Sequence, residues 1–213
     1  MIYDQVDAQS PIRQGDIFRR IPRVDLSLAA LAIVGEDDSY RKTSWRDALA
    51  DNDNGSPIAA LLPIKPVDAI VITQNCDAVR GEYLCLCQID AFLPSIGQSE
   101  PPKSADKWQS LIIKKAREMP RLFYLPPDPS LGFLESMAAD FRVLLRIPRT
   151  DLEDLRDHRI ARLNHESFEH FRESLAHYFR RYAYNEWYPL TKEQYEAYAK
   201  ACGESVKPYP WQE

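Results

Sequence analysis

Hydrophobic positions in the first half of the chain fall into short runs separated by turn residues, which predicts strands. Residues 16–21 follow a Gly–Asp turn, and Pro22 is expected to interrupt this strand because proline has no backbone N–H. Three further runs, 59–64, 69–73 and 82–89, are continuously apolar. Such runs are typical of central strands buried on both faces. We therefore expect a β-rich region built around these strands.

The stretch between the first two of these strands is more polar. Residues 24–34 fit either a strand or a short helix, and a helical turn is expected at 45–50. The sequence 51–55 is rich in Asp and Asn and ends in Gly, which predicts a loop. We interpret this stretch as an insertion between two strands of the sheet.

The second half of the chain mixes helical and strand-like patterns. Ser104 can cap a helix over 105–118, whose apolar positions share one face. Residues 121–125, 141–147 and 158–163 predict returning strands. The hydrophobic pattern thus places one helix between the strands of the sheet.

Two helices are expected towards the C-terminus. The first covers 165–184, and its large apolar side chains fall on one side: Phe168, Phe171, Leu175, Tyr178, Phe179 and Tyr182. A capping box at 191–194 predicts a last helix that ends at Gly203. A second capping box, at 150–153, predicts one short helical turn.

Strands first and helices later indicate the α+β class. We expect a single domain over 1–213, with a β-rich core in 11–95 and 120–163 and the helix 104–118 inserted between them. The sheet is expected to be a small barrel or a strongly bent antiparallel sheet, with the helices of 165–203 as a C-terminal extension.

Composition narrows the class of function. The 213 residues include 7 Gly and 16 Pro, and neither G-x-G-x-x-G nor a P-loop motif occurs, so no nucleotide cofactor is expected. A net charge of −5 argues against a protein that coats duplex DNA. A basic leader and a bilayer-length apolar run are both missing from the sequence. We therefore expect a cytoplasmic protein without membrane association.

Cysteines and histidines are common metal ligands, so their spacing indicates whether a metal ion could bind. The four cysteines, Cys76, Cys85, Cys87 and Cys202, lack the paired spacing of structural zinc sites. The four histidines lie between 158 and 177 and do not form H-E-x-x-H. We expect no metal and no cofactor, reduced thiols, and histidines in solvent.

The strongest candidate for chemistry is the polar segment that follows the apolar run 69–73. Gln74, Cys76, Asp77 and Arg80 are the candidate catalytic residues. Cys76 would be a nucleophile if a cation such as Arg80 favoured its thiolate, and Asp77 would be a base. The structural alternative is that Cys76 packs as a small apolar group while Asp77 closes a turn and pairs with Arg80.

The order of three motifs resembles that of the MazF/PemK-type toxins. The motifs are Gln14–Phe18 (QGDIF), Ala69–Thr73 with Asn75, and Tyr83–Gln88, and the resemblance covers roughly residues 11–92. It implies an SH3-like barrel and a bacterial toxin–antitoxin or phage-defence setting. Thr73 matches the hydroxyl residue that helps the toxins cleave RNA, whereas Pro66-Val67-Asp68 stands where they carry an Arg-Pro pair.

Two functions follow as hypotheses. The first is a non-catalytic interaction module that binds a partner protein in a toxin–antitoxin, phage-defence or stress operon. The second is a divergent, metal-independent endoribonuclease acting on single-stranded RNA. In either case Gly15, Asp16 and Thr73 are the candidate binding residues.

Overall fold

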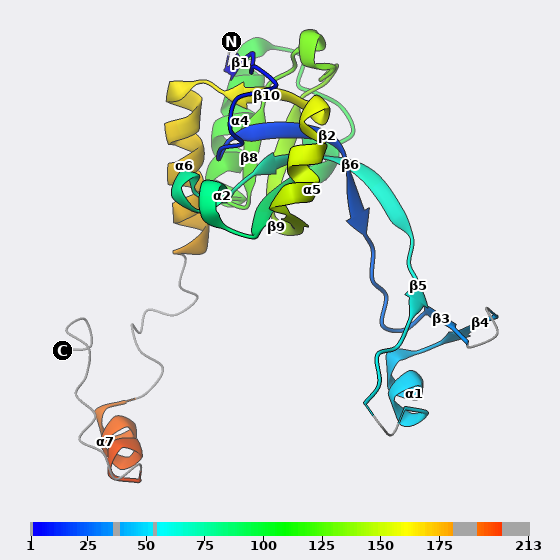
Figure 1. The fold of residues 1–213 in the computed structure, drawn as a ribbon. Coiled ribbons are helices and arrows are strands. Elements are labelled where there is room, and N and C mark those ends of the chain that lie inside the picture. Colours follow the sequence, from blue (N-terminus) through cyan, green and yellow to red (C-terminus); the bar gives the residue numbers. More distant parts are fainter. Residues whose placement is uncertain (1, 36–38, 53–54, 181–190, 202–213) are drawn as a thin grey trace. The chain divides into compact units, whose positions relative to one another are not determined.

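The computed structural model describes residues 2–35, 39–52, 55–180 and 191–201 (Figure 1). The chain divides into two compact units, 1–178 and 179–213, and we treat each by itself. Helix α7, Lys192–Ala201, belongs to the second unit. It begins at the expected capping box, because Gln194 N–H donates to Thr191 Oγ1 at 3.3 Å and Thr191 N–H donates to Gln194 Oε1 at 2.9 Å. The predicted end at Gly203 and the fourth cysteine, Cys202, lie outside the described residues.

A seven-stranded antiparallel sheet forms the centre of the first unit, in the order β1-β10-β2-β6-β7-β9-β8. Its strands are β1 Tyr3–Asp4, β2 Asp16–Val24, β6 Ile64–Val71, β7 Tyr83–Ala91, β8 Leu122–Leu125, β9 Met137–Pro148 and β10 Arg159–Leu163. The expected α+β class and antiparallel pairing are confirmed. The sheet is not closed into a barrel, and β1 and β8 are its two edges.

Helices cover both faces of this sheet (Figure 1). They are α2 Asn75–Arg80, α3 Phe92–Ser95, α4 Ala105–Glu118, α5 Arg149–Asp154 and α6 His165–Phe179, with 3-10 turns at Pro129–Leu131 and Arg156–His158. Phe171 of α6 is fully buried in one apolar cluster with residues from β1, β2, β6, β7, β8, β9 and β10. Leu152 of α5 and Ala78 of α2 are buried in a second cluster, while Phe92 of α3 and Leu122 of β8 belong to a third.

A smaller sheet, in the order β4-β3-β5, forms within the segment that connects β2 to β6. Its elements are β3 Leu31–Val34, β4 Tyr40–Thr43, α1 Trp45–Ala50 and β5 Ala60–Leu61. The helical turn expected at 45–50 is confirmed, and Ser44 Oγ caps it by accepting the Asp47 N–H at 3.2 Å. Among the described residues of 25–63, only Leu31 and Ala48 are buried, so this part of the chain has a very small core.

The helix expected at 105–118 is confirmed with the same bounds, and Ser104 Oγ caps it by accepting the Lys107 N–H at 3.4 Å. The prediction that Pro22 interrupts this strand is wrong, because β2 continues through Pro22 to Val24. Pro22 lies opposite Pro66 at a non-hydrogen-bonded pair, because the hydrogen-bonded pairs alternate from the Asp25 N–H to Pro63 carbonyl bond. Both proline nitrogens therefore point away from the ladder between β2 and β6, which loses no hydrogen bond there. A bulge just before Pro22, with Arg20 at φ 55°, shifts the register.

Two further boundaries differ from expectation. Helix α5 begins at Arg149 with Pro148 as its N-cap, so Thr150 lies inside the helix and does not cap it. The expected strand 59–64 is divided between the small sheet and the start of β6. The division of 59–64 follows from tertiary pairing, since the segment around Ile64 pairs with Val24 in the main sheet.

Candidate functional site

The structure brings the Gly15 turn next to the segment that follows β6. Gly15 N–H donates to the Val71 carbonyl at 2.9 Å, and Gln14 N–H donates to Asn75 Oδ1 at 3.0 Å. Thr73 lies in the same segment, where its Oγ1 accepts the Cys85 N–H at 2.7 Å. The Thr73 hydroxyl therefore ties this segment to β7.

Asp16 is fully buried at the start of β2, in an ion cluster with two arginines of β10. Its carboxylate accepts from Arg159 Nη1 at 3.0 Å, from Arg162 Nη2 at 3.0 Å and from the Arg13 N–H at 2.9 Å. Arg159 also donates to the carbonyls of Asp7 and Ser10 at 2.8 and 2.9 Å. This cluster anchors the N-terminal segment on the sheet.

The four candidate catalytic residues lie together on or beside α2, which the sequence patterns did not predict. Gln74 is the N-cap residue and Cys76, Asp77 and Arg80 belong to the helix, and all four side chains are exposed. No hydrogen bond or ion pair joins these side chains to one another within the described part of the chain. Asp16, in contrast, is enclosed by its arginines, so these residues do not converge on one cleft with it.

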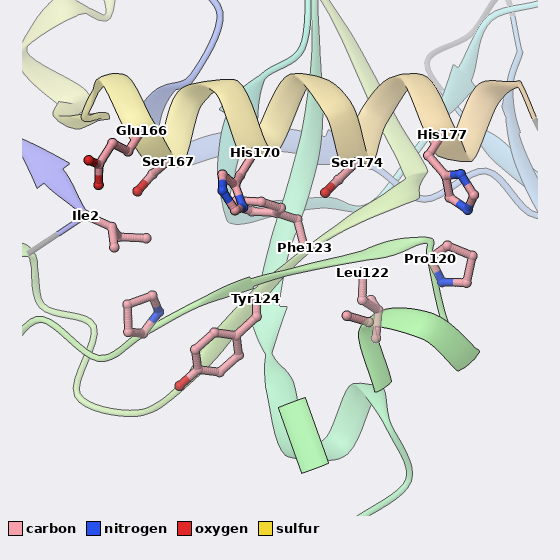
Figure 2. A pocket seen from close by; sticks show the side chains of 12 residues that line it. Ile2, Pro120, Leu122, Phe123, Tyr124, Glu166, Ser167, His170, Ser174 and His177 are labelled. Atoms are coloured by element: carbon pink, nitrogen blue, oxygen red, sulfur yellow. The ribbon is translucent and has the colours of Figure 1, made fainter. Parts of the chain in front are cut away.

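A groove with a cavity volume of about 520 Å³ lies elsewhere, between α6 and the edge strand β8. We call it the edge groove (Figure 2). Its polar lining comes from one side of α6: Glu166, Ser167, His170, Ser174 and His177. Its remaining lining comes from β8 and from residues near the other edge of the sheet and α4: Ile2, Ala116, Pro120, Leu122, Phe123, Tyr124 and Pro126.

Both edges of the main sheet contribute to this groove. Ile2 directly precedes β1, and Leu122 to Tyr124 belong to β8. The two edges are linked where Tyr3 Oη donates to the Pro126 carbonyl at 2.9 Å. Burial raises the pKa of the Tyr3 hydroxyl, which keeps it protonated as the donor in this bond. The groove therefore lies between the open edge β8 and α6, and Ile2 reaches it from the other edge of the sheet.

The sequence pattern placed the histidines on the polar side of α6, in solvent. His170 and His177 are indeed exposed, but both also line the edge groove. The signal that could have revealed this is the stripe of Ser167, His170, Ser174 and His177 at helical spacing, between the apolar and charged sides of the helix. What the sequence could not supply is the open strand edge that faces this stripe.

The described residues contain no group of three or more His, Cys, Asp and Glu side chains that could hold a metal ion. They also contain no helix long and apolar enough to cross a membrane. Comparisons of the chain with protein-family models, with curated proteins and with solved structures found no match.

Proposed function

We propose that this chain is a protein-interaction module that takes up an extended segment of a partner protein in the edge groove, as an added strand on β8. The observation that carries the proposal is that an unpaired strand edge and an apolar floor meet in one groove. An exposed edge offers backbone N–H and C=O groups, and pockets beside it accept alternate side chains of the added strand.

The shape of the groove supports a strand better than a compact ligand. Apolar residues of β8 and Ile2 form the floor, and the polar side of α6 forms one wall. An added strand would pair with β8 and fill the gap towards β1. The SH3-like barrel implied by the resemblance to MazF/PemK-type toxins is part of this proposal, with the partner strand as the piece that brings the sheet closer to closure.

The same resemblance leads us to propose a bacterial, cytoplasmic setting in a toxin–antitoxin, phage-defence or stress operon. The partner would then be encoded by a neighbouring gene. This gives the experiment a defined second protein, which can be produced separately and mixed with the full chain.

Hydrogen–deuterium exchange of the full chain with that neighbouring gene product tests the proposal. We expect protection of β8 and of the groove side of α6. Ser174→Trp, which fills the groove, should abolish the complex, whereas Glu173→Trp, on an exposed neighbouring position of the same helix, should leave it intact. A complex that protects only other regions, or that forms equally with Ser174→Trp, would contradict the proposal.

A metal-independent endoribonuclease is the second candidate, and one observation favours it. The side chains of Gln74, Cys76, Asp77 and Arg80 are all exposed within one short stretch at the end of β6, where an RNA strand could reach them. Cleavage of single-stranded RNA in the presence of a chelator by the wild-type chain, and its loss in Asp77→Ala, would support this function. Absence of cleavage at high protein concentration would exclude it.

A further inference from the structure

We infer the direction and the chemistry of the segment that enters the edge groove, an inference that rests on the proposed function. The segment runs antiparallel to β8 and carries a Lys or Arg two positions before a large apolar residue. The spacing follows from the hydrogen-bonding register of β8, and the two residue types follow from the charge and the apolar surface along the groove.

The register of β8 fixes which backbone groups point outwards. The Phe141 N–H donates to the Arg121 carbonyl at 2.9 Å, opposite one another across the β8–β9 pair. Hydrogen-bonded and non-hydrogen-bonded pairs alternate in an antiparallel ladder, so the N–H and C=O groups of Leu122 and Tyr124 point away from β9. The Leu122 N–H is already used, because it donates to the Met119 carbonyl at 2.9 Å.

Tyr124 is therefore the one β8 residue that offers both a donor and an acceptor on its outer side. A partner residue opposite Tyr124 would exchange both hydrogen bonds with it, and the residue two positions later would reach the Leu122 carbonyl. This pattern favours an antiparallel partner, because antiparallel pairs exchange two bonds between the same two residues.

Successive side chains of a strand point to opposite faces of the sheet, so every second residue of β8 faces α6. Phe123 points towards α6, with its ring 5.1 Å from the Phe171 ring in an edge-to-face contact. Leu125 belongs to the same apolar cluster. The partner residues opposite Phe123 and Leu125 therefore also face α6, and they are the residues immediately after and immediately before the one opposite Tyr124.

Charge along the groove distinguishes these two positions. In Figure 2, α6 runs antiparallel to β8, with Glu166 near Ile2 at one end and His177 near Pro120 at the other. With histidine counted as neutral, Glu166 is the lining residue that carries a formal charge. Its carboxylate forms no ion pair with any described residue. The position opposite Leu125 faces this end, so a Lys or Arg there complements Glu166, in a chain whose net charge is already −5.

In Figure 2 the Phe123 ring lies beneath the middle of α6, beside His170, so a partner residue opposite Phe123 would face the same part of the helix. Here the neighbouring surface is the aromatic ring of Phe123, which a large apolar side chain would cover. The recognised sequence therefore has a cation, one residue of any type, and then a large apolar residue.

Short capped peptides test this inference on the full, isotopically labelled chain by NMR titration at millimolar concentration. The first peptide has Lys, Thr and Ile as its central residues, flanked by Thr and Ser. The second replaces Lys with Gln, and the third moves Lys by one position. We expect the Tyr124 amide to shift with all three, and the first peptide to bind about two- to fivefold more tightly than the second, as expected for one exposed ion pair.

Glu166→Gln should remove the preference for Lys, whereas Glu173→Gln, whose side chain does not line the groove, should keep it. Equal affinity of the Lys, Gln and shifted peptides, with the Tyr124 amide still perturbed, would overturn the cation and its spacing while leaving strand addition intact. If no peptide perturbs Tyr124 or its neighbours in β8, strand addition itself is wrong. The two failures are thereby distinguished.

Discussion

Arg159 and Asp16, 143 positions apart in the chain, form an ion pair in which both side chains are almost completely shielded from water, 1% and 0% exposed. Arg162 shares the same carboxylate. We expect Asp16→Asn to lower the free energy of unfolding by about 3 to 5 kcal/mol, since it leaves a buried guanidinium without its counter-charge. Urea unfolding followed by circular dichroism measures this loss.

Asp68→Asn is the matched control. Its partner Arg19 is more exposed and the N–O distance is 3.5 Å, so the change should cost less than about 1 kcal/mol. Equal losses for the two variants would show that the Asp16 cluster does not anchor the fold. Because Arg159 also holds the carbonyls of Asp7 and Ser10, Asp16→Asn should in addition make the N-terminal segment more sensitive to protease.

Gly15 should not tolerate a side chain. Its φ of +87° is unfavourable for other residues, and an added Cβ would lie 3.2 Å from Cδ2 of Phe168. We expect Gly15→Ala to destabilise the protein by about 2 to 3 kcal/mol in thermal or urea unfolding. Gly55, at φ +68° with nothing within 4 Å of the added Cβ, isolates the backbone effect, and Gly55→Ala should cost about 1 kcal/mol.

The amino-acid sequence predicted elements whose signals are local. The sequence predicts the helix 105–118 with the observed bounds because the serine cap and the apolar positions that share one face agree. Helix α2 was missed because six residues with one buried side chain, Ala78, carry no hydrophobic periodicity. The continuation of β2 past Pro22 was missed because it depends on the register with β6, in which the Pro22 nitrogen points away from that strand.

In the candidate site too, features encoded within one segment could be predicted, and features that depend on distant segments could not. The polar segment after β6 could be found from the sequence, since reactive side chains follow an apolar run directly. The burial of Asp16 could not, because both arginines that enclose it lie on β10. The edge groove joins β8 to a helix some forty positions later, and no motif within either segment indicates that they meet.

The cysteines should differ in reactivity. Cys76 is exposed, Cys85 is half-buried and Cys87 is fully buried. Burial also raises the pKa of the Cys87 thiol, which reduces the fraction of reactive thiolate. With iodoacetamide at neutral pH and peptide mass spectrometry, we expect Cys76 to be alkylated well before Cys87, which should react only in denaturant. Early labelling of Cys87 would contradict the buried strand.

Asp140 should make stability depend on pH in the acidic range. Burial alone would raise the pKa of this carboxyl, but hydrogen bonds from Arg142 and the guanidinium of Arg121 outweigh it and lower the pKa below 3.8. The stabilisation is present above the unfolded value of 3.8 and is lost as the pH falls through the lower folded pKa. Urea midpoints measured down to about pH 2 should therefore fall more steeply for the wild type than for Asp140→Asn.

The small core of residues 25–63 has a consequence for how the molecule unfolds. The main sheet ends here with the last pair of β2 and β6, Val24 and Ile64, followed by the hydrogen bond from the Asp25 N–H to the Pro63 carbonyl at 3.3 Å. Beyond it, Leu31 and Ala48 are the only buried residues among those described. We therefore expect residues 25–63 to unfold and refold as a separate cooperative unit under native conditions while the seven-stranded sheet stays folded.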